Sequence, residues 1–285
     1  MSKVFKEKLL KEALKLYAGE YVLKEVLKQG YDFLQLGGKK EEATVYFQDL
    51  TDFTSLSEHI DPKDLVRLQE DYLNSMTDCV NKNGGILDKY IGDSFSAFWS
   101  GSDHPIQASL CALECLHAAS DLSKKWSEKG VPEINIQIGI DSGSVFVGNF
   151  GSVKRLYYTT MGDATNSALS FVSANKMYGS NIIIGEQTYT LVKDKFFARP
   201  LDRMQKKGIN KPIMLLELIG SKDNPLPQNV KNMLPLFVTG YKYYLKQDWK
   251  KAVDCFTSCL ESVPDDGPSR FYLERCQRFT ENPSQ

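Results

Sequence analysis

Two aspartates lie where a chain would need them to hold a metal ion beside a phosphate. Asp49 ends a predicted strand, TVYFQDL, and the segment LTDFT follows that strand closely. Asp93 lies in the Gly92-Asp93 turn of KYIGDSF, between two further predicted strands. If these strands are neighbours, both carboxylates can bind one or two Mg²⁺ ions, which prefer oxygen ligands. Two metals suit in-line attack at phosphorus, because one activates the attacking oxygen and the other neutralises the leaving group.

A second set of polar residues gathers around a predicted helix, GDATNSALSFVSANKMYG. Thr159 precedes this helix, and Asn166 and Ser170 lie four residues apart within it. Positions i and i+4 share one face of a helix, so these two side chains point the same way. Lys89 lies four residues before Asp93. Each residue alone has an ordinary explanation, such as a turn former or a solvated lysine; only their joint occurrence favours a site.

The elements that must position these residues alternate between strands and helices. Asp61 can cap a helix over DPKDLVRLQEDYLNSMTDCVNKNGG, Pro62 suits its first turn, and Gly84 and Gly85 end it. PIQASLCALECLHAASDLSKKW predicts a second amphipathic helix, and the alternation in INIQIGID predicts a half-buried strand. Strands joined by hairpins and mixed with helices favour an α+β fold, a sheet with helices packed on it.

The two ends of the chain differ from this central part. The predicted organisation is an N-terminal helical segment (1–40), the mixed domain (41–220), a polar linker (221–232) and a helical unit (233–285). The spacing in this last unit is that of a tetratricopeptide repeat, carried by Gly240, Tyr243, Ala252, Phe256 and Pro264. One such repeat rarely folds alone, so we expect it to pack on the main domain, on another subunit or on a protein partner.

Composition excludes several classes of function. The net charge of −1 argues against nucleic acid as a partner. The six cysteines show no CxxC spacing and are expected to be buried reduced thiols. The N-terminus lacks the apolar core of a signal peptide, and no apolar run approaches the roughly 20 residues that a membrane span requires. We therefore expect a cytoplasmic protein with no transmembrane segment.

With these motifs in view, the sequence resembles the class III nucleotidyl cyclases, the adenylate and guanylate cyclase family. TVYFQDLTDFTSL resembles the first metal motif of that family, and LDKYIGDSFSAFW resembles the second. IGIDSGSVFVGNFGSVKRLYYTTMGDATN resembles the long signature after the central strand, and QKKGINKPIMLLEL resembles the closing strand pair. The likeness covers about residues 41–220 with little gapping, and the tail resembles helical repeats that follow some bacterial cyclase domains.

The resemblance implies how metal and triphosphate are held. Asp49 and Asp93 would bind two Mg²⁺ or Mn²⁺ ions, with the carbonyl of Leu50 assisting. Phe53 and Thr54 would lend backbone amides to the triphosphate.

The resemblance also implies how the nucleotide is read. Lys89 and Thr159 would contact the base, and such a pair resembles the adenine-selecting pairs of the family, which makes ATP the expected substrate. Asn166 would orient the ribose and triphosphate, and Lys207 would contact phosphate. In the family one subunit supplies the metal-binding aspartates and the other supplies the base-reading and transition-state residues, so a homodimer would make two sites. The reaction is attack of the ribose 3′-oxygen on the α-phosphate, giving 3′,5′-cyclic AMP and pyrophosphate.

The sequence departs from the family pattern at Ser170, where the motif has an arginine that stabilises charge on the transferring phosphoryl group. A hydroxyl cannot replace a guanidinium fork. Losing one such donor typically costs about 3–4 kcal/mol, or roughly 10²–10³ in rate. Lys154 and Arg155, in the preceding turn, are candidate substitutes, whereas Lys176 is expected to point away from the Asn166 face.

Four hypotheses follow from this departure. The chain is an adenylate cyclase of reduced activity, or a pseudocyclase that binds nucleotide and acts as a regulatory or scaffold subunit. Alternatively, it forms a heterodimer with an arginine-bearing cyclase, or it cyclises another nucleotide. The first is favoured because a decaying site has no reason to retain two metal-binding carboxylates.

Overall fold

A single mixed sheet organises the molecule in the computed structural model, which describes residues 2–51, 53, 57–58, 60–205 and 212–281. The sheet has eight strands in the order β2-β3-β1-β4-β6-β8-β7, with β5 paired to β4. The strands are β1 (Gly37–Leu50), β2 (Ile86–Ile91), β3 (Ser94–Ser100), β4 (Ile136–Ser152), β5 (Arg155–Met161), β6 (Ile182–Gly185), β7 (Phe196–Met204) and β8 (Ile213–Ser221). The predicted α+β class and the hairpin around Gly92-Asp93 are confirmed.

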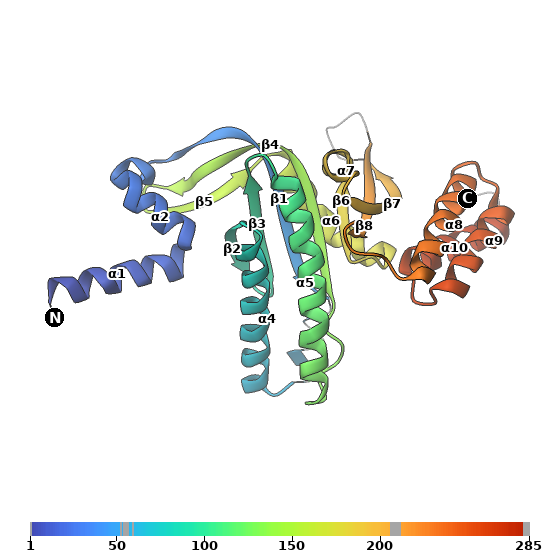
Figure 1. Ribbon diagram of the computed structural model, residues 1–285, viewed down its shortest axis with the longest axis horizontal. Helices are drawn as coiled ribbons and strands as arrows, with labels where there is room; N and C mark the ends of the chain where they lie inside the picture. The colour runs from blue at the N-terminus through green and yellow to red at the C-terminus, as the bar shows by residue number, and fades with distance from the viewer. Residues whose placement is uncertain (1, 52, 54–56, 59, 206–211, 282–285) are drawn as a thin grey trace.

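Helices flank this sheet and continue at both ends of the chain (Figure 1). They are α1 (Lys3–Ala18), α2 (Glu20–Gln29), the 3₁₀ helix η1 (Gly30–Leu34), α4 (Pro62–Lys82), α5 (His104–Ser127), α6 (Asp163–Tyr178), α7 (Glu186–Val192), α8 (Gln228–Leu245), α9 (Trp249–Ser262) and α10 (Gly267–Glu281). Asp61 caps α4 as predicted, because its carboxylate accepts from the Lys63 amide at 2.9 Å. Helix α8 begins inside the segment predicted to be a linker.

The alternation of side chains along β1 divides the core into two layers. Tyr46 and Leu50 point to one face, where they pack with apolar residues of α4 and α5. Val45 and Phe47 point to the other face, beneath α6. Because successive side chains of a strand lie on opposite faces, the strand that carries Asp49 is fixed in register by burial on both sides.

The β4–β5 hairpin extends from the sheet as an arm, and the N-terminal helices lie beside it (Figure 1). The ring of Tyr158 on β5 stacks on Tyr21 of α2 with 5.1 Å between centroids and lies 5.4 Å from Phe33. Asn149 on β4 donates to the Phe33 carbonyl. Helix α1 buries none of its residues against the rest of the chain. The N-terminal segment is thus tied to the arm through α2 and η1.

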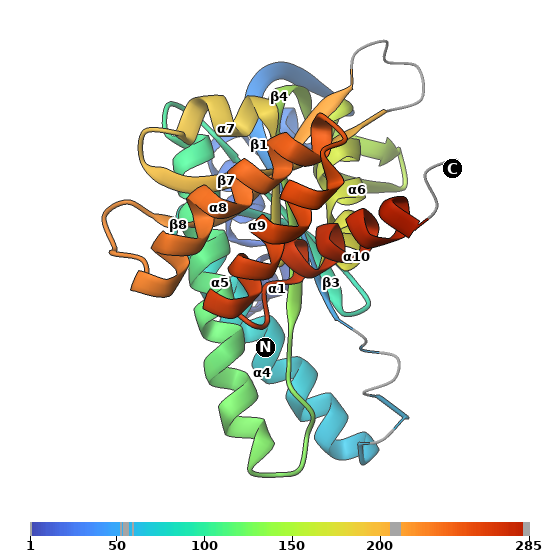
Figure 2. The same ribbon diagram turned by 90° about the vertical axis from the view of Figure 1, so that its right-hand side faces the viewer.

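The C-terminal helices α8, α9 and α10 pack at the opposite end of the molecule from α1 (Figures 1 and 2). Their apolar side chains form one cluster with residues of α6, β6, β7 and β8. The ring of Tyr178, at the end of α6, meets Phe271 edge-on at 4.9 Å. Of the three docking surfaces predicted for this unit, the main domain of the same chain is the one observed. Its relation to tetratricopeptide repeats remains a prediction.

Candidate active site

The two aspartates singled out by the sequence lie together at one end of the central strands. β1 and β3 are antiparallel with Gln48 opposite Phe95, which brings Asp49 beside Ser94. Ser94 Oγ donates to Asp49 Oδ1 at 2.5 Å. Burial and then the charge of Asp49 raise the pKa of Asp93, while backbone amides, including that of Leu50, oppose this shift. The predicted convergence of the two carboxylates is therefore present within one chain.

This pair has the chemistry of a site for a hard divalent cation. Two partly buried carboxylates repel each other, and a cation between them would relieve that repulsion. Their oxygens suit Mg²⁺ or Mn²⁺ rather than softer metals. Within the described residues no group of three or more His, Cys, Asp or Glu side chains is placed to bind a metal. Further ligands would thus come from backbone carbonyls, water or substrate phosphates, as in nucleotide-processing sites.

Lys89 and Thr159 also meet, although 70 positions separate them in the sequence. Lys89 lies on β2 and Thr159 on β5, and Lys89 Nζ donates to Thr159 Oγ1 at 3.3 Å. The same ammonium lies 5.6 Å from the centre of the Tyr157 ring. The pair presents a donor and a hydroxyl at one place, which is the arrangement needed to read the edge of a base.

A neighbouring residue that the sequence reasoning missed joins this pair. Asp88 accepts from Thr159 Oγ1 at 2.8 Å and from Ser96 Oγ at 2.9 Å, and Lys89 Nζ lies 3.4 Å from its other oxygen. Its side chain is only 6% exposed. The only feature of the sequence that pointed to Asp88 was its position beside Lys89 in LDKYIGDSF. Regular alternation along a strand would have placed the side chains of Asp88 and Lys89 on opposite faces of the sheet. A register shift between Leu87 and Lys89 breaks that alternation.

Helix α6 carries Asn166 and Ser170 on an exposed face. The helix lies so close to β4 that a Cβ on Gly139 would come within 2.0 Å of the Ala168 carbonyl oxygen. Asn175 fixes the far end of the helix, donating to the Ile138 carbonyl at 2.8 Å. Ser170 Oγ donates to the Asn166 carbonyl at 2.8 Å, so its hydrogen is used within its own helix.

The other predicted residues divide into three groups. Phe53 is half-buried and packs against the α4–α5 side of the core. Thr54 and Lys207 lie outside the described residues. Lys154 precedes β5, and Arg155 is the first residue of that strand, where it pairs with Ser152 at the tip of the arm. The six steps from Arg155 to Met161 span about 20 Å at 3.3–3.4 Å per residue. The arm thus carries both cations away from α6 of the same chain.

The sequence comparisons agree with this geometry. A family described as "Adenylate and Guanylate cyclase catalytic domain" matches residues 37–218. Adenylate cyclase 1 of Rhizobium meliloti (strain 1021) is 30% identical over 207 residues, which cover 70% of this chain and 31% of that protein. An adenylate cyclase of Anabaena cylindrica is 32% identical over 197 residues, covering 67% of this chain and 39% of that protein. The chain thus spans about a third of the length of these relatives.

Solved structures show the same fold. The adenylyl cyclase CyaB from P. aeruginosa superposes with a TM-score of 0.61 at 29% identity, over 67% of this chain and all of that one. The guanylyl cyclase Cya2 superposes with a TM-score of 0.60 at 27% identity, over 66% of this chain and 96% of that one. Relatives with either substrate thus share the fold.

None of the helices in the described part of the chain is both long and apolar enough to span a membrane.

The match of residues 37–218, together with the placement of the cyclase motifs on one sheet, identifies the family. The chain belongs to the adenylate and guanylate cyclase catalytic-domain family, the class III nucleotidyl cyclases.

Proposed function

We propose that this protein is an adenylate cyclase that converts ATP to 3′,5′-cyclic AMP and pyrophosphate. The observation that carries the proposal is the contact between Lys89 and Thr159, at 3.3 Å. Lysine donates and a threonine oxygen accepts, which complements the ring nitrogen and the amino group of adenine. Named relatives that are adenylate cyclases at 30% and 32% identity support the same substrate.

The metal would lie between Asp49 and Asp93. When bound, divalent cations would neutralise the triphosphate and activate the attacking 3′-oxygen. The protein would keep the two carboxylates oriented. Ser94 donates a hydrogen bond to one oxygen of Asp49, and the backbone amide of Leu50 donates to Asp93. The carboxylates are thus held in place before a nucleotide arrives, which avoids reorganisation during the reaction.

A second copy of the chain would complete each site. Large apolar side chains are exposed on β2 and β5, which carry the base-reading pair, on the adjoining β4 and on α6, namely Tyr90, Ile91, Phe146, Tyr157, Met161 and Leu169. An exposed apolar surface of this kind is typical of a protein interface. Asn166 is exposed on the same helix as Leu169, where it is open to a partner. In the proposed homodimer, the aspartates of one chain face the base-reading pair and Asn166 of the other.

Ser170 makes the proposed enzyme slow. Its hydroxyl donates to the carbonyl of Asn166, so no hydrogen is left for a phosphoryl oxygen. Strand β5 places Arg155 about 20 Å from Met161, the residue two positions before α6, so no substitute comes from that turn of the same chain. Since one charged donor is typically worth about 10²–10³ in rate, the remaining groups would support turnover at a reduced rate.

The same hydroxyl contact favours a second candidate function, a pseudocyclase that binds nucleotide without turning it over and acts as a regulatory or scaffold subunit. In that case the C-terminal helices would carry the function through a protein partner. The retained carboxylate pair makes this the weaker candidate.

The test is product formation by the purified protein with Mn²⁺ and, separately, ATP, GTP, CTP and UTP. We expect cyclic AMP from ATP in excess of the other cyclic products, and loss of all product in Asp93→Ala. Asp78→Ala, a substitution on the exposed face of α4, is the matched control. Binding of ATP without any product in wild type would establish the pseudocyclase instead.

A further inference from the structure

We propose that Asp88 is the residue that makes the base site select an amino purine over a keto purine, by fixing the Thr159 hydroxyl as an acceptor. This inference rests on the proposed function and concerns the specificity of the same site. Asp88 would not touch the nucleotide; it would act through Thr159, as a positioning residue.

The contacts around Asp88 leave little freedom to the groups beside it. Its side chain is 6% exposed. Both Thr159 Oγ1 and Ser96 Oγ donate to the same oxygen, Oδ2, at 2.8 and 2.9 Å. Lys89 Nζ lies 3.4 Å from the other oxygen. Burial raises the pKa of Asp88, and the hydrogen bond from Thr159 and the charge of Lys89 oppose that shift. An ionised carboxylate only accepts hydrogen bonds, so the direction of the Thr159 bond is fixed by its partner.

The polarity of the Thr159 hydroxyl follows from its two neighbours. A threonine hydroxyl has one hydrogen and two lone pairs, and a lysine ammonium can only donate. Lys89 Nζ approaches Thr159 Oγ1 at 3.3 Å and therefore uses one lone pair. The single hydrogen points to Asp88. What remains for a ligand is one lone pair, so Thr159 offers a base an acceptor and no donor.

This polarity discriminates between bases by hydrogen-bond type. The six-position amino group of adenine is a donor and the adjacent ring nitrogen is an acceptor, so they match Thr159 and Lys89. A six-keto purine has the reverse pattern: its oxygen would face the Thr159 lone pair, and its ring N–H would face the ammonium. A site built to hydrogen-bond one group rejects an analogue that leaves its polar atoms unpaired. Asp88 is the residue that prevents Thr159 from turning its hydrogen toward a keto oxygen.

The alternative is that Asp88 only holds strands together. It joins β2 to Ser96 on β3 and to Thr159 on β5, and a buried hydrogen-bonded carboxylate contributes to stability wherever it occurs. A purely structural role would lower the activity toward every nucleotide alike. The ratio of activities toward two bases distinguishes the two roles.

The experiment compares ATP with inosine triphosphate, which differs from ATP only in carrying the keto group and the ring hydrogen. The readout is the ratio of kcat/KM for the two substrates in wild type and in Asp88→Asn. The Asn amide can donate to Thr159 and release its hydrogen. We expect the preference for ATP to fall about tenfold or more, the typical effect of one misplaced hydrogen bond in a buried site. Asp78→Asn, an identical change on the exposed face of α4, should leave the ratio unchanged.

A double-mutant cycle with Thr159→Val tests the route of the effect. Valine has no hydroxyl to orient. Asp88→Asn should therefore change the ratio of kcat/KM for ATP and inosine triphosphate when Thr159 is present, and should leave that ratio unchanged in the Thr159→Val background. An equal change in both backgrounds, or an unchanged ratio with lower activity toward both substrates, would overturn the proposal. Thermal unfolding of each variant identifies loss of fold.

The failure of the proposed function would be recognised separately. If wild type forms no cyclic product from either nucleotide, cyclase activity is refuted, and the affinities for ATP and inosine triphosphate are measured by calorimetry with Mn²⁺. The same variants then test the polarity of Thr159 by the ratio of the two dissociation constants. If Asp88→Asn leaves the ratio of the two dissociation constants unchanged, the role of Asp88 in base selection is refuted in this case as well.

Discussion

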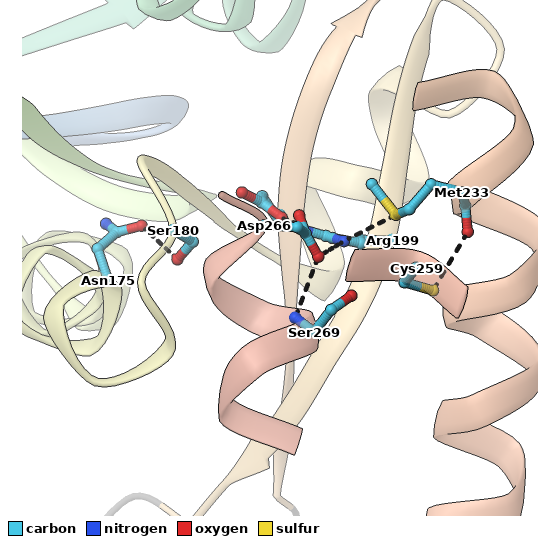
Figure 3. Close-up of polar contacts among 8 residues, drawn as sticks. Asn175, Ser180, Arg199, Met233, Cys259, Asp266 and Ser269 are labelled. Atoms are coloured by element: carbon cyan, nitrogen blue, oxygen red, sulfur yellow. Dashed lines mark hydrogen bonds and ion pairs between the residues drawn. The ribbon is translucent and has the colours of Figure 1, made fainter. Parts of the chain in front are cut away.

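The buried arginine that joins the C-terminal helices to the sheet gives the sharpest prediction on stability. Arg199, on β7, is 2% exposed and donates to Asp266 through two nitrogens, at 2.9 and 2.6 Å (Figure 3). Its Nε also donates to Glu217 at 2.7 Å. Asp266 in turn accepts from the Ser269 amide at 3.0 Å, so it caps the start of α10. We predict that Asp266→Asn destabilises the whole protein, because it leaves a buried guanidinium with one carboxylate instead of two.

The magnitude follows from these contacts. Breaking a buried ion pair by removing one partner typically costs about 3–5 kcal/mol. Glu217 remains, and asparagine can still accept from Ser269, so we take the lower end, about 3 kcal/mol. At about 2 °C per kcal/mol for a chain of this size, the melting temperature should fall by about 6 °C.

The assay is thermal unfolding followed by far-ultraviolet circular dichroism, with Asp265→Asn as the matched control. Asp265 precedes Asp266 and is exposed, so its loss of charge should shift the melting temperature by about 1 °C or less. Equal melting temperatures for the two variants would refute the reasoning that the Arg199 network holds the helical unit on the sheet.

Three further predictions concern the site and the core. Ser170→Arg should raise kcat for cyclic AMP formation at least tenfold and up to about 10²–10³-fold, because it supplies a charged donor on the exposed face of α6; an unchanged kcat with ATP still bound would contradict this role. Lys89→Met should lower kcat/KM for ATP by about 10–100-fold, since it removes a charged hydrogen bond to the base, and steady-state kinetics would show no loss if Lys89 lies outside the site. His104 accepts or donates a 2.6 Å hydrogen bond with Thr44, and burial lowers its pKa. The unfolded chain then takes up a proton first as the pH falls below about 6.5, so this contribution to stability is present above that pH and is lost below it. His104→Gln should therefore reduce the drop in melting temperature between pH 7.5 and 5.5, and an identical drop in both proteins would show that His104 does not contribute.

The sequence predicted best what depends on local pattern. The alternation around the Gly92-Asp93 turn predicted the β2–β3 hairpin, and the capping residue Asp61 predicted the start of α4. Gly179, the last residue of the predicted helix segment GDATNSALSFVSANKMYG, ends α6 with a left-handed φ of 65°. Each of these features is decided within a few neighbouring residues, where propensities and turn chemistry act.

Contacts between residues far apart in the chain could not be predicted from local sequence patterns. Arg199 lies 67 positions from Asp266, and no local pattern marks a strand arginine as buried. Gly139 reads as an ordinary strand glycine, although the structure shows that α6 rests on it. The role of Asp88 was hidden for the same reason, because its partner Thr159 lies on another strand and an aspartate beside a lysine is ordinarily solvated.

The candidate site was partly predictable because its motifs are short and each ends a predicted element. Asp49 and Asp93 converge as predicted, and Lys89 meets Thr159. The sequence alone did not indicate how the Ser170 hydroxyl is used, since a serine within a helix can bond either to a ligand or to the preceding turn. The structure shows the second arrangement.

The measurement that tests the central claim most directly is complementation between two inactive variants, Asp93→Ala and Asn166→Ala. If each site takes its carboxylates from one chain and Asn166 from the other, a heterodimer of the two variants contains one intact site and one site with both defects. An equal mixture after subunit exchange forms heterodimers as half of its dimers, so it should recover about one quarter of the wild-type rate of cyclic AMP formation with Mn²⁺. No recovery in a mixture shown to contain heterodimers would contradict a site shared between two chains.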